Sequence, residues 1–151
     1  MEWRFLEPND FKWMMQTTKE HHAESDWSEV KYDEEKVAKY VDSMINDPSY
    51  FGIVALKDEE RIGFMAGRML EYNFSREKFA RELELYVEPT KRTGMAGVFM
   101  MRKFMDWAKM NGALEAYFEP RLSDNEIKKF DAMAKRLGME HFANAYRRKL
   151  A

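Results

Sequence analysis

The sequence predicts an α/β (α+β) fold in which a mixed central sheet is flanked by helices. The chain has 151 residues, 45% of them apolar, which is enough to bury one core. Segments with the two-residue period of strands interchange with segments of helical period, in the order β-α-α-β-β-β-α-β-α-β. The succession 80–87, 94–110 and 113–119 is typical of a β-α-β unit, which implies a right-handed crossover. We therefore expect a single domain over residues 1–151.

The N-terminal third is expected to hold one strand and two helices. Residues 2–7 alternate and predict a strand with its two aromatic side chains inward. Asn9 or Asp10 can cap the first helix. Residues 17–34 lack a clear period and are expected to form a long loop. Asp33 can cap a second helix, whose apolar residues fall at helical spacing.

The rest of the chain predicts a hairpin followed by alternating helices and strands. Residues 50–74 contain two apolar strands around the charged turn "KDEER". The stretch "RELELYV" alternates, with three apolar residues on one face and Glu82, Glu84 and Tyr86 on the other. The remaining elements are a helix over 94–110 closed by Asn111-Gly112, a strand over 113–119, a helix from Ser123 or Asp124 to Leu137 terminated by Gly138, and a last strand within 140–150.

Composition excludes several classes of function. The net charge is −2, so there is no general footprint for nucleic acid. The apolar runs are too short to span a bilayer, and the N-terminus has no leader pattern, so we expect a cytoplasmic protein that acts on no membrane. The absence of cysteine excludes disulfides, thiolate metal sites and cysteine nucleophiles.

The stretch "YVEPTKRTGMAGVFM", residues 86–100, combines a strand end, a proline, positive charge and two glycines before an apolar helix. The start of such a helix is suited to phosphate, because its first amides have no intrahelical partner and its dipole favours anions. A P-loop needs a lysine followed by Ser or Thr after the last glycine, and this stretch has neither. Gly94-x-x-Gly97 is too little for a Rossmann fingerprint.

The stretch does resemble the pyrophosphate loop of the GNAT superfamily of acetyl-CoA-dependent acetyltransferases. Their pattern, Arg/Gln-x-x-Gly-x-Gly/Ala after a "V-x-P" strand end, is matched by Val87-Glu88-Pro89 and by Lys91 through Ala96, with Lys91 in place of Arg or Gln. "RIGFMAG" and "FDAMAKRLGM" resemble two further segments of the family. "DWSEVKYDEEKV", "YNFS" and "LYVEP.KR.G" together are similar to a phage-associated branch.

The resemblance implies acetyl-CoA as co-substrate and no metal. Backbone amides of the loop would hold the pyrophosphate, cations would add charge, and strand backbone would pair with the pantetheine arm. The Val87 amide would also polarise the thioester carbonyl. The residues implied to bind the co-substrate are Leu85, Val87, Lys91, Arg92, Thr93, Gly94, Met95, Ala96, Gly97 and Asn125.

Acetyl transfer to an amine needs a neutral amine, so a base or a water chain helps. Glu84 is the first candidate, because relatives often carry an acid at its position; both it and Glu82 could instead be solvated or paired with Arg68 and Arg76. Relatives commonly place the acid that protonates the thiolate, a tyrosine, where this chain has Ala134. Tyr86, Tyr117, Tyr146 or solvent could substitute, with Tyr86 our choice.

Acceptor binding is expected mainly from the segment "HHAESDW". Acids and aromatic rings there could attract a cationic amine. A metal site of His21, His22 and Glu24 is disfavoured, because adjacent histidines point apart. The residues expected to bind the acceptor are His22, Glu24, Trp27, Tyr72 and Glu82.

The function that the resemblance implies is therefore N-acetylation of a small molecule or protein through a ternary complex, since no cysteine can carry the acyl group. A binding or interaction module with little catalysis is the alternative, and a homodimer stays open.

Overall fold

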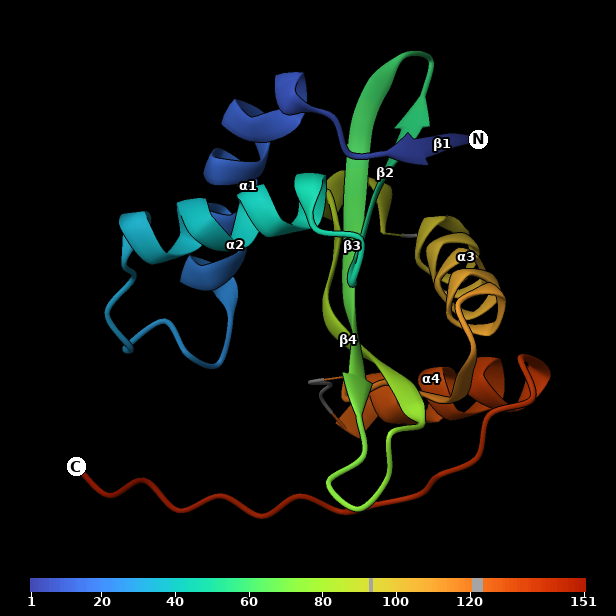
Figure 1. Cartoon of the computed structure of the whole chain (residues 1–151). Helices are drawn as coiled ribbons and strands as arrows, with labels where there is room; N and C mark the ends of the chain where they lie inside the picture. The colour runs from blue at the N-terminus through green and yellow to red at the C-terminus, as the bar shows by residue number, and fades with distance from the viewer. Residues whose placement is uncertain (93, 121–123) are drawn as a thin grey trace. The chain divides into compact units, whose positions relative to one another are not determined.

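The computed structural model describes residues 1–92, 94–120 and 124–151. They divide into two compact units, Met1–Glu119 and Pro120–Ala151. The first unit holds a five-stranded sheet in the order β1-β2-β3-β4-β5 (Figure 1). The strands are β1 (Glu2–Phe5), β2 (Tyr50–Lys57), β3 (Glu60–Glu71), β4 (Lys78–Val87) and β5 (Ala113–Tyr117). The first four are antiparallel neighbours and β5 runs parallel to β4, which confirms the predicted mixed sheet.

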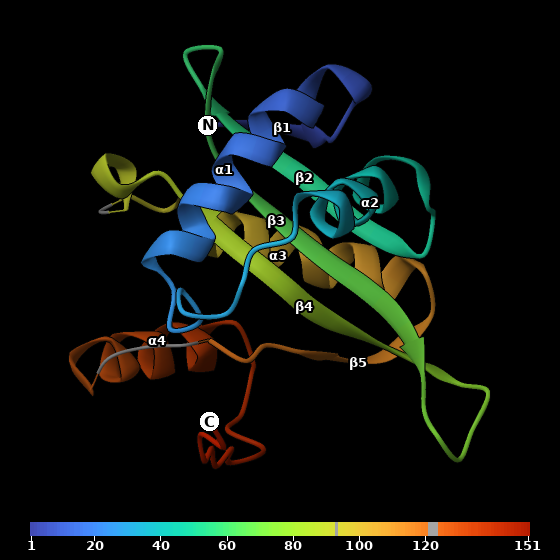
Figure 2. The same cartoon turned by 90° about the vertical axis from the view of Figure 1, so that its left-hand side faces the viewer.

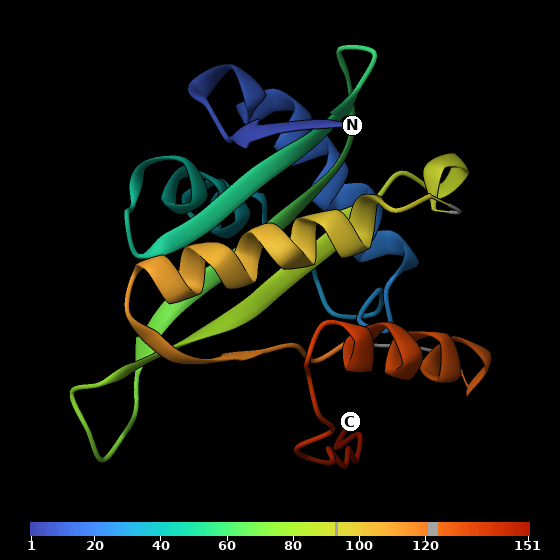
Figure 3. The same cartoon turned by 90° about the vertical axis from the view of Figure 1, so that its right-hand side faces the viewer.

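Helices cover both faces of this sheet. Helices α1 (Phe11–Glu24) and α2 (Glu34–Asn46) lie on one face, as Figure 2 shows, and α3 (Ala96–Met110) lies on the other, as Figure 3 shows. Two short 3-10 turns, Pro8–Asp10 and Pro89–Lys91, precede α1 and α3.

Each face of the sheet has its own apolar core. On the α1/α2 face the ring of Phe64 stacks on that of Tyr86, with centroids 5.9 Å apart. On the α3 face Phe51 packs against Phe104, with centroids 5.4 Å apart. The buried cluster of the α1/α2 face consists of Leu6, Met14, Val41, Met44, Val54, Phe64, Ala66 and Tyr86.

Local sequence signals account for several element ends. The Asp33 side chain accepts a hydrogen bond from the backbone N–H of Lys36 at 3.0 Å, as expected of an N-cap. The β2–β3 turn places Asp58 and Glu59 at positive φ, the geometry that matches the twist of a tight hairpin. Gly112 follows α3 at a φ of 82°. These three predicted boundaries are confirmed.

Helix α1 is longer than the sequence pattern predicted. The expected loop over 17–34 is wrong in its first part, because the helix continues to Glu24. Its inward face is completed by Thr17 and Thr18, which are buried although polar. The Thr18 hydroxyl donates to the Met14 carbonyl at 2.8 Å, so its polar atom is satisfied within the helix.

The faces of β1 also differ from the prediction. Its aromatic side chains, Trp3 and Phe5, were expected inward but are exposed, Phe5 to 52%. Between them Arg4 forms an ion pair with Asp10 at 2.6 Å. Asp10 is fully buried and also accepts from Arg61 at 2.7 Å. Its side chain therefore anchors two arginines and makes no cap bond to α1.

The second unit contains α4 (Asp124–Arg136), after which Gly138 adopts a φ of 75°. The predicted last strand within 140–150 is not formed, since residues 139–151 have neither helix nor strand. The proposed cap at Ser123 lies outside the described residues. Among those described, no helix is both long and apolar enough to cross a membrane. A single domain over 1–151 remains a prediction.

Candidate functional site

The sheet opens between β4 and β5. Their parallel pairing involves only Lys78, Ala80 and Arg81 of β4, although that strand continues to Val87. In the part of the chain that the structure describes, no strand pairs with the outer edge of β4 beyond Arg81. This outer edge, residues 82–87, is called the open edge below.

The register shows which backbone groups face the open edge. Glu88 donates its N–H to the Ile62 carbonyl at 2.8 Å, and Val87 lies opposite Gly63. In an antiparallel pair, residues that bond to the partner alternate with residues that point away from it. Leu85 and Val87 therefore direct their N–H and C=O groups away from β3, toward the open edge.

The start of α3 lies beside this edge. The helix begins after Met95, which provides no side-chain cap, and its first helical hydrogen bond runs from the Phe99 N–H to the Met95 carbonyl. The amides before Phe99 thus have no intrahelical acceptor. A Cβ built on Gly97 would lie 3.9 Å from the Leu85 side chain, so the first turn of α3 contacts β4.

Gly94 has no structural reason to be glycine. Its φ is not in the left-handed region, and the nearest atom to an added Cβ would be the Lys91 carbonyl oxygen, 3.6 Å away. The space in front of this backbone is open, which suits the close approach of a ligand. Thr93, the next residue expected to bind phosphate, lies outside the described residues.

The two cations of the loop have different surroundings. Lys91 is exposed at the end of the 3-10 turn. The Nε of Arg92 donates to the Val87 carbonyl at 2.7 Å, and a terminal nitrogen of the same guanidinium contacts Glu24, the last residue of α1. Arg92 therefore ties the loop to α1 instead of extending freely toward the α3 amides.

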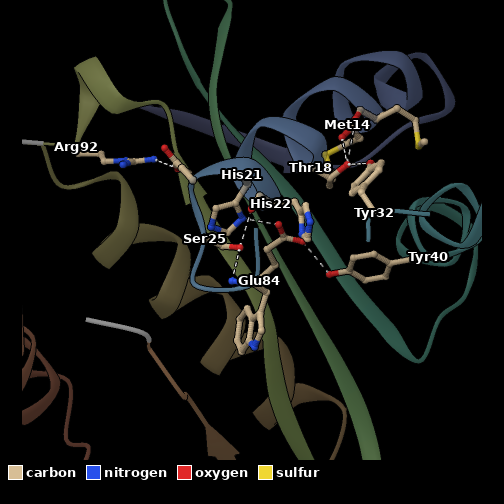
Figure 4. A network of polar contacts seen from close by, with 12 residues as sticks. Met14, Thr18, His21, His22, Ser25, Tyr32, Tyr40, Glu84 and Arg92 are labelled. Carbon is tan, nitrogen blue, oxygen red and sulfur yellow. Dashed lines mark hydrogen bonds and ion pairs between the residues drawn. The ribbon is translucent and has the colours of Figure 1, made fainter. Parts of the chain in front are cut away.

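A carboxylate and an imidazole meet on the α1/α2 face of β4. The Nδ1 of His21 lies 2.5 Å from Oε2 of Glu84, and the Tyr40 hydroxyl donates to Oε1 of Glu84 at 3.3 Å (Figure 4). Glu84 was predicted as the base, with pairing to Arg68 and Arg76 as the alternative; among the described residues neither arginine has an ion pair with Glu84, and Arg68 lies over the Tyr50 ring. His21 comes from the segment predicted as loop, and sequence reasoning gave it no catalytic role.

Two groups near Glu84 have raised pKa values, so they hold their protons more strongly than usual. Burial is the main cause that raises the pKa of Glu82 to about 7, and the nearby charge of Glu84 adds to it. Burial, followed by the charge of Glu84 and the hydrogen bond to it, raises the pKa of Tyr40 well above its usual value. Glu82 can therefore exchange a proton near neutral pH, whereas Tyr40 stays protonated.

A β-bulge separates the two acids of β4. Glu84 lies opposite Ala66 and Glu82 opposite Gly67, so Leu83 is an extra residue between them. The prediction that the two acids share one face did not include this bulge, but the charges of Glu84 and His21 both act on Glu82, and both acids act on Tyr40. The alternation does hold for Glu84 and Tyr86.

Tyr86 is buried beside the dyad of His21 and Glu84. Its ring centroid lies 5.3 Å from that of His21, and the Arg92 guanidinium lies 5.6 Å from the ring centre. Burial, together with the charges of Glu20 and Glu24, raises the pKa of Tyr86. The structure thus places this predicted catalytic tyrosine next to an unpredicted histidine.

The residues predicted to bind the acceptor are not all brought together. His22 points away from the dyad and donates from Nε2 to the Val30 carbonyl at 2.8 Å. Trp27 lies in the loop after α1, where its side chain is 43% exposed. Tyr72 lies beyond the far end of the β3–β4 ladder and donates to Glu115 of β5. Only Glu24 and Glu82 lie near Tyr86 or the dyad.

The remaining candidates are placed as follows. Tyr117 on β5 donates to Glu115 at 2.9 Å, and Tyr146 lies in the irregular C-terminal segment. Asn125 and Ala134 belong to α4 in the second unit, so their roles stay predictions. Among the described residues, no three His, Cys, Asp or Glu side chains are grouped to hold a metal ion.

Solved structures share this fold. An aminoglycoside acetyltransferase, meta-AAC0020 from an uncultured soil metagenomic sample, is 19% identical with a TM-score of 0.72, over 98% of this chain and 95% of that one. The aminoglycoside 6'-N-acetyltransferase AAC(6')-IG of Acinetobacter haemolyticus is 18% identical with a TM-score of 0.70, over 100% of both chains. A ribosomal-protein-alanine N-acetyltransferase of Brucella melitensis biovar Abortus 2308 is 12% identical with a TM-score of 0.71, over 99% of both.

These identities support a common fold and no more. A search of the curated proteins finds no match. The model of the acetyltransferase (GNAT) family, however, matches residues 11–138, which include the open edge, the start of α3 and all of α4. This chain therefore belongs to the GNAT acetyltransferase family and is an acyltransferase.

Proposed function

We propose that this protein transfers an acetyl group from acetyl-CoA directly to an amine. The observation that carries the proposal is the open edge of β4 leading to the uncapped start of α3. Leu85 and Val87 direct backbone groups to that edge, where the amide-containing pantetheine arm can bind as an added strand does. The Val87 carbonyl already accepts from Arg92, so the groups left for the arm are the two N–H groups and the Leu85 carbonyl. The Val87 N–H would polarise the thioester carbonyl.

The pyrophosphate of acetyl-CoA fits the residues at the start of α3. The amides of Ala96 and Gly97 precede the first helical hydrogen bond, and Gly94 leaves open space before them. Lys91 is exposed and can add positive charge. Arg92 can contribute only if it leaves Glu24 and the Val87 carbonyl, so we assign it a smaller share of the binding free energy.

The acceptor that this site suits is a cationic amine. Glu20, Glu24 and Glu82 lie near Tyr86 or the dyad. Glu24 is paired with Arg92, so the carboxylates of Glu20 and Glu82 would attract an ammonium group. Structural neighbours act on such amines: by their names, two acetylate aminoglycosides and one acetylates alanine of a ribosomal protein. We propose the same chemical class here; the phage-associated branch stays a prediction.

Acetyl-CoA titration followed by turnover tests this function. Calorimetry should show saturable binding of acetyl-CoA. Turnover is then followed with a thiol reagent against a panel containing sisomicin and a peptide with an N-terminal alanine. Because the chain has no cysteine, the reagent reports only released CoA. Absence of acetyl-CoA binding to the folded protein would refute the proposal.

A second candidate, an acyl-CoA-binding module with little catalysis, is favoured by one observation. Ala134 occupies the position at which the resemblance implies a tyrosine that protonates the thiolate. Saturable acetyl-CoA binding without CoA release from any amine would support this candidate and exclude the enzyme.

A further inference from the structure

We propose that Nε2 of His21 is the base that deprotonates the amine acceptor, and that Glu84 is its positioning partner. This inference rests on the proposed acetyltransferase function and adds a catalytic residue to it. It also assigns Glu84, predicted from the sequence as the base itself, to a different task.

The geometry separates the two ring nitrogens of His21. Nδ1 lies 2.5 Å from the Glu84 carboxylate, which can only accept when ionised. In the neutral ring Nδ1 therefore carries the hydrogen, and the lone pair is on Nε2. An imidazole oriented by a carboxylate in this way is a general base in acyl-transfer sites of unrelated folds.

Nε2 is also accessible. Among the described residues, no hydrogen bond involves this atom, and no buried side-chain nitrogen or oxygen lacks a partner. Nε2 must therefore reach solvent, in agreement with the 28% exposure of the His21 side chain.

Glu84 is less suited to act as the base. Oε2 is occupied by His21 and Oε1 by the Tyr40 hydroxyl, so both oxygens already have hydrogen-bond partners. Its side chain is only 16% exposed. These contacts instead hold the carboxylate in place behind the imidazole, as Figure 4 shows.

Charged and titratable groups from several elements face the dyad. β4 contributes Tyr86, in ring contact with His21, and Glu82, whose charge acts on both His21 and Tyr40. Tyr40 comes from α2, and the guanidinium of Arg92, which pairs with Glu24, lies 5.6 Å from the centre of the Tyr86 ring. The carboxylates favour an arriving ammonium.

Each proton and each bond of the proposed transfer can be followed from the ammonium and the thioester to the products. The ammonium gives one proton to Nε2, and its nitrogen lone pair attacks the thioester carbonyl carbon. The C–N bond forms, the C–S bond breaks, and its electron pair stays on sulfur. The second proton of the nitrogen goes to the thiolate, which gives CoA and the amide. The imidazolium then returns its proton to solvent.

The test compares wild type with His21→Ala, and uses His141→Ala as the matched control. His141 is exposed in the irregular C-terminal segment, and the chain has only three histidines. We expect His21→Ala to lower kcat about 100-fold or more, with unchanged acetyl-CoA affinity, and added imidazole to restore part of the rate. Glu84→Gln should lower kcat by a smaller factor.

A second readout does not depend on turnover. Nitrogen-15 NMR of the histidine rings should show the neutral His21 ring with its hydrogen on Nδ1, and Glu84→Ala should abolish that preference. If folded His21→Ala protein keeps the wild-type kcat, or if the neutral His21 ring carries its hydrogen on Nε2, the assignment of His21 and Glu84 is wrong, but the proposed acetyltransferase function is not affected. If the wild-type protein binds acetyl-CoA but acetylates no amine, both the proposed amine acetylation and the roles of His21 and Glu84 are wrong.

Discussion

Gly94→Asp should separate ligand binding from folding. The structure leaves open space in front of Gly94, with only the Lys91 carbonyl oxygen near an added Cβ, at 3.6 Å. The backbone there is not left-handed, so a side chain adds no strain; Gly94→Ala should stabilise the fold by about 0.4–1 kcal/mol through the unfolded state. The aspartate carboxylate, however, would lie against the pyrophosphate.

The size of the effect follows from Coulomb's law. Two like charges about 5 Å apart repel by about 1–3 kcal/mol for effective dielectric constants between about 80 and 20. With two phosphate charges the loss is about 2–6 kcal/mol, so the Kd for acetyl-CoA should rise at least about 30-fold. Calorimetry measures the Kd, and thermal denaturation measures the stability.

Gly112 offers the matched control for this experiment. Its φ of 82° makes any side chain strained, but it lies after the far end of α3 from the proposed phosphate site. Gly112→Asp should therefore lower the melting temperature and leave acetyl-CoA affinity unchanged, the reverse of Gly94→Asp. If folded Gly94→Asp protein bound acetyl-CoA as tightly as wild type, the assignment of the phosphate site would be wrong.

Three further changes test other parts of the site. Charge reversal of Lys91 and Arg92 together should weaken acetyl-CoA binding more at low salt than at high salt, because the lost attraction is screened; a salt-independent loss would contradict an electrostatic role. Ala134→Tyr should raise turnover and hardly change acetyl-CoA affinity, and identical turnover would assign thiolate protonation elsewhere. Glu82→Gln should stabilise the fold more at pH 8 than at pH 5: the folded pKa of about 7 lies above the usual 4.5, so the native state loses stability as pH rises through that range. Equal gains at the two pH values, measured by chemical denaturation, would refute the burial of its charge.

Signals that act within a few residues predicted much of the fold. The Asp33 cap, the charged β2–β3 turn and the end of α3 at Gly112 each depend on local backbone chemistry, and each is confirmed. The end of α1 was missed, because its buried face is continued by threonines that the hydrophobic pattern does not count. Met14, Thr18 and His21 share that face at helical spacing, and including threonine would have extended the helix.

The candidate site was harder to predict, because long-range packing determines it. The bulge at Leu83 shifts the register of β4 against β3, and nothing in its sequence marks it. The contact of His21 with Glu84 joins residues 63 positions apart, so it depends on how α1 lies on the sheet. The exposed aromatics of β1 have a similar cause: the buried charge of Asp10 requires Arg4 on the inner side.

The open edge of β4 has a consequence for solubility. An unpaired strand edge is a template for another chain, and proteins ordinarily shorten, charge or cover such edges. Here Leu83 is 40% exposed along it, and a foreign strand would pair with the outward N–H groups of Leu85 and Val87 and with the Leu85 carbonyl. A bound pantetheine arm would occupy the same hydrogen-bonding positions. The co-substrate would then also act as a shield against edge-to-edge association, and light scattering of concentrated protein should fall when acetyl-CoA is added.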